Sequence, residues 1–323
     1  MPEMQSYMGV NEGNDGIIGK LLYYSTANIL IPKDKFIELG NAFNLPKVKP
    51  ARESAASAYR YATTALKDRI AEKDACGTHI YRIYCRDNKQ DTSDIICREL
   101  VKETLDSTTN NYKKLANIAF KRETEEMFYD NTEYDPEIDA AQYCERALTL
   151  YERFKSCYNT DHVDSVVQFL LENMQAVIIN IHGNLYFIPS IHMPLLNIFE
   201  DYIEVLSKNN LNAGNVSSNS MFVANDEKQR EKMTAEFYMN YKRDIETYEE
   251  RIQHFIDNGC SSEAVICRWL KKIEALKQKK LTYEQVLKRR LDDLDRDFSL
   301  LQMQSQELSL RAVKNQTEIP LAA

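Results

Sequence analysis

The first two-thirds of the chain contain segments with two kinds of hydrophobic pattern, one typical of strands and one typical of helices. Residues 17–27 are rich in apolar and aromatic side chains and predict a strand, whereas apolar residues recur every three or four positions across 50–72 and predict a helix. Segments 79–86, 94–101 and 115–120 alternate or are β-rich, with polar links between them. Because these links are too short for parallel crossovers, we expect an antiparallel meander.

Helical periodicity returns after an acidic stretch. The pair Asp135 and Pro136 predicts the start of one helix, and Thr160 predicts the start of another. Residues 176–188 then predict a hairpin that leads into a helix. His182 falls at the turn and His192 in the entering helix, roughly 15 Å apart by the length of the returning strand. We therefore do not expect these two histidines to share a metal ion.

The last third of the chain has one continuous helical pattern. Gly259 is the only glycine between residues 226 and 313, and this span contains no proline. Apolar residues recur at helical spacing on both sides of Gly259, which predicts a long helical hairpin of coiled-coil type. Around Leu287 two consecutive steps of four interrupt the alternation of four and three, which is the signature of a stutter.

The two arms of this hairpin have unequal lengths. At 1.5 Å per residue the first arm would be about 48 Å long and the second about 75 Å long, so roughly 25 Å of the second arm lacks a partner within the hairpin. Leucines at helical spacing are seldom left in water. We expect them either to pack on the N-terminal body or, as we favour, to meet another chain. The candidate interface residues are Leu291, Leu294, Phe298, Leu301 and Leu308.

Together these elements predict an α+β protein with a mostly antiparallel sheet and helices, followed by the long C-terminal helical hairpin. We expect a flexible arm at residues 1–16, an α+β body at 17–225, the hairpin at 226–316 and a tail at 317–323. The chain of 323 residues is long enough for two domains of ordinary size.

Charge is unevenly distributed along the sequence. The formal net charge is −8, but residues 226–314 hold 18 basic and 17 acidic residues, so the excess lies upstream. An acidic body disfavours anionic membranes and a general nucleic-acid surface. The stripe 268–290 is basic, however, and suits a solvated face of the coiled coil, the acidic residues of a second copy or a phosphate backbone. The candidate nucleic-acid contacts are Arg268, Lys271, Lys272, Lys279, Lys280, Arg289 and Arg290.

No motif for catalysis or cofactor binding is present in the sequence. The segment GNDGIIGKL has asparagine and leucine where a phosphate-binding loop needs glycine and serine or threonine. His162 lies between Asp161 and Asp164, but acids are ordinary in the first turn of a helix. We assign no catalytic, cofactor-binding or metal-ligating residue, expect no cofactor, and lean against an enzyme.

Cysteine usage and hydropathy indicate the compartment. The seven cysteines include no pair at C-x-x-C spacing, which argues against a disulfide framework or a zinc ribbon. The N-terminus has no basic segment followed by an apolar stretch, and no apolar run is long enough to span a membrane. We expect a cytoplasmic protein that does not enter membranes.

Three blocks carry a resemblance to a known group of proteins: KLLYYS at 20–25, PARESAASAYRYATT at 50–64 and NLYFIPSIHMPLL at 184–196. These blocks resemble an uncharacterised family of prokaryotic proteins often carried by phages and other mobile elements. The resemblance covers the order of features over residues 17–225. It implies a prokaryotic or phage cytosol and a role in phage–host conflict, but no reaction and no catalytic residue.

We therefore expect a non-enzymatic interaction or assembly protein of phage or mobile-element type. It would act through the hairpin by homo-oligomerisation or by contact with a host or phage protein. The alternative is a nucleic-acid-associated protein that uses the basic stripe 268–290. A third hypothesis is an enzyme with an unrecognised site in the N-terminal body.

Overall fold

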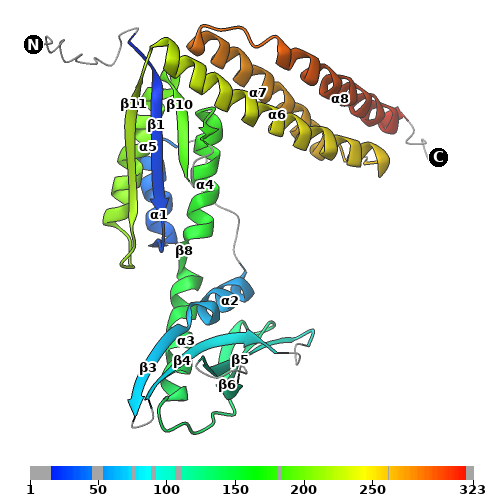
Figure 1. Cartoon of the computed structure of the whole chain (residues 1–323). Helices are drawn as coiled ribbons and strands as arrows, with labels where there is room; N and C mark the ends of the chain where they lie inside the picture. Colours follow the sequence, from blue (N-terminus) through cyan, green and yellow to red (C-terminus); the bar gives the residue numbers. More distant parts are fainter. Residues whose placement is uncertain are drawn as a thin grey trace, which may run out of the picture. The chain divides into compact units, whose positions relative to one another are not determined.

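The computed structural model describes residues 16–45, 54–74, 77–88, 92–105, 111–179, 184–260 and 262–317 (Figure 1). Internal contacts divide the chain into two compact units. The terminal unit comprises the N-terminal segment up to Ser25, Val167–Ser207 and the chain from Val216 onward. The central unit comprises Thr26–Val166 and Lys208–Asn215. The mixed architecture, with antiparallel sheets and helices at the C-terminus, confirms the predicted fold class.

The central unit is built around a five-stranded antiparallel sheet whose strands follow one another in chain order. The three predicted strands of the meander are therefore confirmed, and a further strand extends the sheet at each edge. The strands are β3 (Lys67–Asp74), β4 (Gly77–Asp87), β5 (Ile95–Thr104), β6 (Asn111–Lys121) and β7 (Glu126–Asp130).

The prediction of a helix over residues 50–72 is wrong for its C-terminal part. Helix α2 (Ala55–Ala65) ends at Leu66, and β3 follows at once. Ile70, which fits the helical pattern, instead lies opposite Tyr81 in the β3–β4 pair. Pairing with a neighbouring strand has overridden the local periodicity, as tertiary context commonly does.

Two helices cover the core of the central sheet, α2 and α3 (Ala140–Ser156). Tyr59 of α2 stacks on Phe120 with ring centroids 5.5 Å apart, and its hydroxyl donates a 2.7 Å hydrogen bond to the carbonyl of Ile118. The remaining elements of the unit are β2 (Leu30–Pro32), which pairs with β8 (Cys157–Asn159), and α1 (Lys33–Ala42).

The start of α3 differs from the prediction by several residues. Its N-cap is Asp139, whose side chain accepts hydrogen bonds from the N–H groups of Ala141 and Gln142. Asp135, the predicted cap, is buried and binds lysines of the sheet instead. Both aspartates suit a helix start, and only the position of the lysines separates their roles.

The terminal unit contains a four-stranded sheet in the order β11-β1-β10-β9. Its strands are β1 (Ile17–Thr26), β9 (Val177–Ile178), β10 (Leu185–Pro189) and β11 (Val216–Ala224). The predicted first strand is confirmed as β1, and the antiparallel β9–β10 pair confirms the hairpin. The predicted turn residue His182 lies outside the described residues. Gly19 is needed where β1 meets β10, because a Cβ there would lie 2.1 Å from the carbonyl oxygen of Ile188.

In the chain, α4 (Thr160–Asn173) precedes strands β9 and β10, and α5 (Met193–Lys208) follows them. The start of α4 at Thr160 is as predicted. Helix α5 lies against β1, where the rings of Phe199 and Tyr24 meet edge to face at 6.0 Å. A short 3₁₀ turn (Ser190–His192) leads into α5.

Three helices complete the terminal unit, α6 (Glu227–Asp257), α7 (Glu263–Leu287) and α8 (Asp293–Thr317) (Figure 1). Phe237 of α6 stacks on Tyr283 of α7 at 4.2 Å between ring centroids. The ring of Tyr283 also contacts Phe187 of β10 edge to face at 6.0 Å. These aromatic contacts join the helices to the sheet in one apolar core.

The predicted second arm is not continuous. Helix α7 ends at Leu287, Lys288 adopts a left-handed conformation with φ 51°, and α8 packs beside α6 and α7 in the same core. One left-handed residue costs about 1–3 kcal/mol, whereas burying each large apolar side chain stabilises by about 1.5–3 kcal/mol. The candidate interface residues are thus buried within the chain: Leu291 (5% exposed), Leu294 (0%), Phe298 (8%), Leu301 (0%) and Leu308 (0%).

The expectation that these five residues lack an intramolecular partner was wrong, and the reason for placing them at an interface between chains is removed. The stutter at Leu287 marks the break, which the arm-length argument did not use. Glu284 stabilises the break between α7 and α8, because its Oε1 accepts a 2.8 Å hydrogen bond from the N–H of Leu291. This N–H belongs to the linker before α8 and has no helical partner of its own.

Candidate functional site

A cleft of about 490 Å³ lies within the terminal unit, between the C-terminal end of α4, β10, α6 and α7. Small-molecule sites fall in this size range. Its lining is unusually rich in groups that form hydrogen bonds. They are the charged residues Glu172, Asp244, Lys272 and Lys279, the amides Gln168, Asn173, Gln175 and Gln278, and the phenols Tyr186 and Tyr248.

Lys279 is one of the two lysines that line this cleft. Its Nζ donates a 3.0 Å hydrogen bond to the carbonyl of Ala176 and lies 3.9 Å from Oδ2 of Asp244. Its side chain is 18% exposed. Burial lowers the pKa of Lys279; the nearby Asp244 and Glu172 oppose this effect, but they do not outweigh it.

Asp244 shows the complementary shift. Burial raises the pKa of its carboxyl, and the positive charges of Lys279 and Arg243 only partly offset the effect. The charged form of each partner is therefore disfavoured even though the other stands beside it. A distance of 3.9 Å is too long for a charge-assisted hydrogen bond, which is normally 2.7–2.9 Å long.

The end of α4 explains why a lysine lies here. Gln175 follows the helix with φ 52° and reverses the chain, so the carbonyls of Gln175 and Ala176 have no helical partner. Lys279 and Tyr283 are four residues apart and hence lie on one face of α7. Lys279 donates to the carbonyl of Ala176 at 3.0 Å, and Tyr283 donates to the carbonyl of Gln175 at 2.9 Å. Oε1 of Gln175 is buried and has no hydrogen-bond partner among the described residues.

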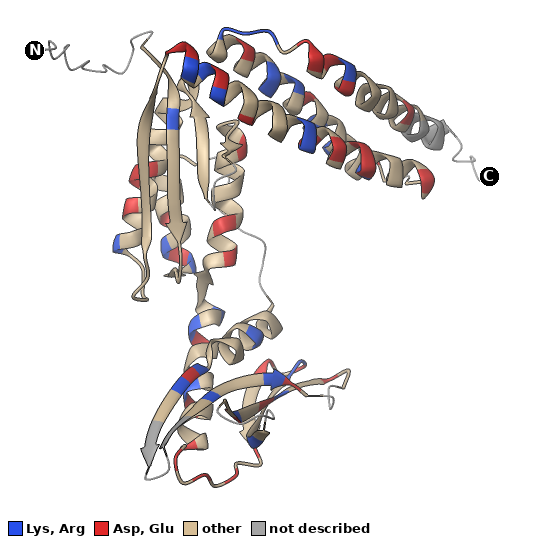
Figure 2. Ribbon diagram, viewed as in Figure 1, with Lys and Arg blue, Asp and Glu red and all other residues tan. Residues whose placement is uncertain are grey.

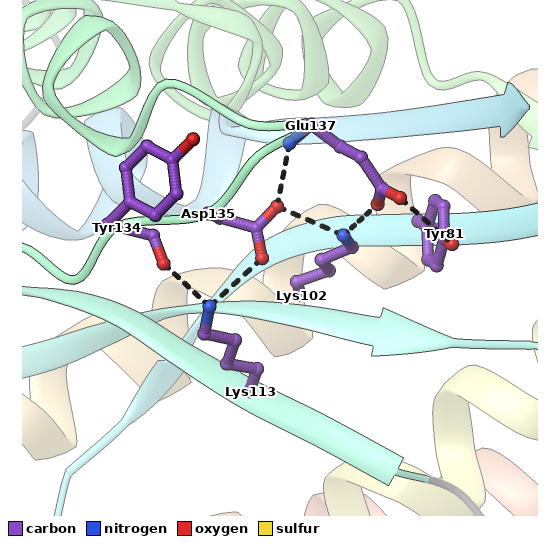
Figure 3. A network of polar contacts seen from close by, with 6 residues as sticks. All are labelled: Tyr81, Lys102, Lys113, Tyr134, Asp135 and Glu137. Atoms are coloured by element: carbon purple, nitrogen blue, oxygen red, sulfur yellow. Dashed lines mark hydrogen bonds and ion pairs between the residues drawn. The ribbon is translucent and has the colours of Figure 1, made fainter.

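A second lysine–carboxylate centre lies in the central unit (Figure 3). Lys102 of β5 binds both Asp135 (3.1 Å) and Glu137 in the loop before α3, and its Nζ stands 4.0 Å from the ring centroid of Tyr81. Asp135 also accepts from Lys113 of β6 at 3.2 Å and from the N–H of Glu137 at 3.1 Å. Every charged group in this network has a close partner.

The pKa shifts in this network run the other way. Burial alone would raise the pKa of Asp135, but hydrogen bonds from Lys102, the Glu137 N–H and Lys113 outweigh it and lower the pKa. Burial alone would lower the pKa of Lys102, but hydrogen bonds to Glu137 and Asp135 outweigh it and raise the pKa. The network is what a structural ion pair requires, and its geometry leaves no group unpaired.

The structure separates the seven candidate nucleic-acid contacts into two sets. Lys279 lines the cleft, and Lys280 is buried between Asp295 (2.6 Å) and Glu284 (3.2 Å). The other five are exposed, three on α7 and two in the linker before α8. They are Arg268, Lys271, Lys272, Arg289 and Arg290. The stripe therefore does not present all of its charge on one surface.

The histidines that stood out in the sequence do not gather metal ligands. Asp161 accepts a 2.7 Å hydrogen bond from the hydroxyl of Tyr61, and Asp164 accepts one from Thr26. Nε2 of His192 is buried and has no hydrogen-bond partner in the part of the chain that the structure describes, and burial lowers the pKa of this ring. Across the described parts of the chain, no three His, Cys, Asp or Glu residues lie close enough together to hold a metal ion.

Comparison with known proteins gives a family and little else. A family model described as a family of unknown function, DUF6744, matches residues 17–314. No curated protein and no solved structure matches the chain. Among the described helices, none is long and apolar enough to cross a membrane.

Proposed function

Because the chain belongs to DUF6744, a family of unknown function, we propose its role from its own surfaces: it binds other protein chains, copies of itself included, and assembles with them. This assembly takes place in the cytoplasm of a prokaryotic cell, in the phage or mobile-element setting that the sequence blocks suggest. The partner outside the assembly is a host or phage protein.

The observation that carries this proposal is the outer edge of the terminal sheet, beside which no further strand lies among the described residues. Strand β11 is the end strand and contains no charged residue and no proline (Figure 2). Met221 and Phe222 on it are 63% and 44% exposed. Proteins usually protect such edges with lysine, proline or a bulge, because an open edge accepts a strand from another chain. An unprotected edge of nine residues supports strand addition.

A second copy of this chain suits the edge well. Two β11 strands paired antiparallel about Ser220 would place Asn219 opposite Met221 of the other copy, on both sides of the centre of a short uncharged ladder. No like charges would meet, and two four-stranded sheets would join into one.

Helix α8 offers a further uncharged surface in the same unit. Leu300, Met303 and Leu310 are 48%, 60% and 65% exposed, on the side opposite the buried Leu301 and Leu308. Between Asp297 and Glu307 the helix carries no charge (Figure 2). Large apolar side chains that recur on one outer face support a protein contact there as well.

The nucleic-acid alternative has less support. With Lys279 and Lys280 engaged inside the chain, only five of the seven candidate basic residues face solvent. Those five are divided between α7 and the linker before α8. Phosphate binding draws on the number of lysines and arginines that reach the backbone together, so the loss of two weakens this function.

Light scattering on the purified full chain tests the proposal. We expect the native mass to be twice 37.5 kDa. Asn219→Lys with Met221→Lys would set lysine against lysine twice in the paired strands and should give single chains. Asn219→Lys with Met221→Glu would set lysine against glutamate instead and should restore the dimer.

Both pairs of substitutions change exposed side chains, so neither is expected to impair folding. A wild-type mass of one chain at all concentrations, or equal masses for the two variants, would contradict assembly through β11. Met303→Lys on α8 is the matched probe of the second surface and should leave the β11 dimer intact.

A further inference from the structure

We propose that Lys279 forms an imine with a small hydroxylated aldehyde or ketone that binds in the cleft between α4, β10, α6 and α7. This site is independent of the assembly surfaces on β11 and α8. The proposal rests on the position of the amine, on the carboxyl beside it, and on the amide side chains that line the same cleft.

The position of the amine is the first element of the argument. An ammonium group has three N–H donors, and Lys279 uses one on the carbonyl of Ala176 at 3.0 Å. Asp244, at 3.9 Å, does not close a short hydrogen bond with it. The amine therefore reaches the cleft with bonding capacity to spare, whereas the buried Lys280 beside it in sequence is held by Asp295 and Glu284.

The electrostatic surroundings favour the reactive form of this amine. Only the neutral amine attacks a carbonyl carbon, and lysines buried in clefts become nucleophiles for this reason. The charged groups around Lys279 are Asp244 and Arg243 on α6 and Glu172 on α4, and burial outweighs their combined effect to lower its pKa. Each unit of pKa lost raises the fraction of free amine at pH 7 about tenfold.

The lining of the cleft indicates which carbonyl compounds fit. With Lys279 neutral and Asp244 protonated, the remaining charged groups are Glu172 and Lys272, whose charges cancel. A neutral ligand is therefore favoured. Hydrogen-bond partners for the hydroxyl groups of a ligand are the amides of Gln168, Asn173, Gln175 and Gln278, which line the cleft.

The bonding changes balance without any other reactant. The lone pair of the Lys279 amine forms a C–N bond with the carbonyl carbon, and the carbonyl oxygen takes a proton from the carboxyl of Asp244. The amine nitrogen returns a proton to that carboxylate, which gives a carbinolamine. The hydroxyl then leaves as water with one more proton from Asp244, nitrogen forms the C=N bond, and its remaining proton returns to the Asp244 carboxylate. The products are the imine and one water.

Reductive trapping on the full chain tests the proposal. Glyceraldehyde is the probe, sodium cyanoborohydride reduces the imine to a stable secondary amine, and peptide mass spectrometry locates the label. The matched internal control is Lys277, which is exposed on the same helix two residues away. We expect Lys279 to be labelled faster than Lys277 at pH 7, because the lowered pKa of Lys279 leaves more of its amine uncharged. Labelling of Lys279 no faster than Lys277 would overturn the proposal.

Two variants separate chemistry from structure. Gln175→Ala should reduce the preference of Lys279 for glyceraldehyde over propanal, which has no hydroxyl groups, while leaving its reaction with propanal unchanged. An unchanged preference would remove the hydroxylated ligand class. Asp244→Asn keeps the shape of the side chain and should slow labelling of Lys279 but not of Lys277. Equal rates before and after this substitution would show that the carboxyl carries no proton and would overturn the mechanism. Fluorescence of Trp269, the only tryptophan, checks that each variant retains the fold of the terminal unit.

Discussion

Lys102 in the central unit and Lys279 in the terminal unit are both largely withdrawn from water, and both face an aspartate. Their side chains are 10% and 18% exposed. Around Lys102, short hydrogen bonds compensate the cost of burial, so the pKa of the lysine is raised and that of Asp135 is lowered. Around Lys279 the aspartate stands 3.9 Å away, so the pKa of the lysine is lowered and that of Asp244 is raised.

The difference shows that burial of an ion pair does not by itself define a role. At Lys102 the second carboxylate, Glu137, and the second lysine, Lys113, complete the network, and the arrangement holds a loop to a sheet. At Lys279 the one short bond goes to a neutral carbonyl, and the rest of the amine faces a cleft. Buried charges whose desolvation cost is offset by short hydrogen bonds are typical of structural ion pairs. Buried charges in a cleft whose cost is only partly offset are typical of reactive sites.

The largest expected effect follows from breaking the compensated centre. Lys102→Met removes the more buried of the two lysine partners of Asp135, whose side chain is only 4% exposed, and also the lysine partner of Glu137. A hydrogen bond to a charged group contributes about 1.5–3 kcal/mol, so we expect the loss of two such bonds to lower the free energy of unfolding by about 3 kcal/mol or more. Urea unfolding followed by far-UV circular dichroism measures the loss, and hydrogen exchange should rise first in β5 and β6.

The matched control is Lys113→Met, at the partner of Asp135 that is 44% exposed. An exposed ion pair contributes less than about 1 kcal/mol, so this variant should unfold close to wild type. Equal losses for the two variants would show that burial of Lys102 does not set the cost.

Part of this contrast is visible in the sequence, and part of it is not. The alternation around Tyr81 and Ile83 predicts β4, and the helical spacing from Met233 onward predicts α6, because each pattern records one buried face. The same patterns do not show where α8 turns back, since Lys288 takes a left-handed conformation with no glycine to mark it. The stutter at Leu287 was the available signal.

The candidate site is still harder to predict, since its groups come from four separate elements. Lys279 stood out only as one member of a basic stripe, and nothing in the sequence distinguishes it from Lys280 beside it. Asp244 lies 35 positions earlier among many other acids. The i,i+4 spacing of Lys279 and Tyr283 indicates a shared face of α7, but only the fold places the open carbonyls of the α4–β9 turn before that face.

Asp135 and Lys279 should both make the protein more stable as the pH rises, but in different pH ranges. Asp135 has a lowered pKa in the folded state, so its contribution to stability is present above its ordinary pKa of 3.8 and is lost as acid protonates it. Lys279 also has a lowered folded pKa, but for a base this means that the unfolded chain binds the proton more tightly. Its charge therefore costs stability below its folded pKa, and the cost disappears as the pH rises toward 10.5.

Urea midpoints measured against pH test these signs, each against its own variant. Asp135→Asn should remove part of the acid-induced fall in stability between pH 5 and the acid limit. Lys279→Met should remove a rise in the stability of the terminal unit on the alkaline side, which Trp269 fluorescence reports from α7. Parallel pH profiles for wild type and Lys279→Met would contradict the uncompensated state of this lysine.

The smallest effect should come from Lys279→Met at neutral pH, the same substitution that is costly at position 102. The variant loses a charge-assisted hydrogen bond to the carbonyl of Ala176, which is worth about 1.5–3 kcal/mol. It also removes a buried charge that its surroundings disfavour, and an apolar side chain of similar length often replaces such a charge at little cost. Because these two effects oppose each other, we expect a net change within about 1 kcal/mol, measured by Trp269 fluorescence in urea. A loss as large as that of Lys102→Met would mean that Lys279 serves mainly to hold α7 against the end of α4, and the cleft would then be a by-product of that contact.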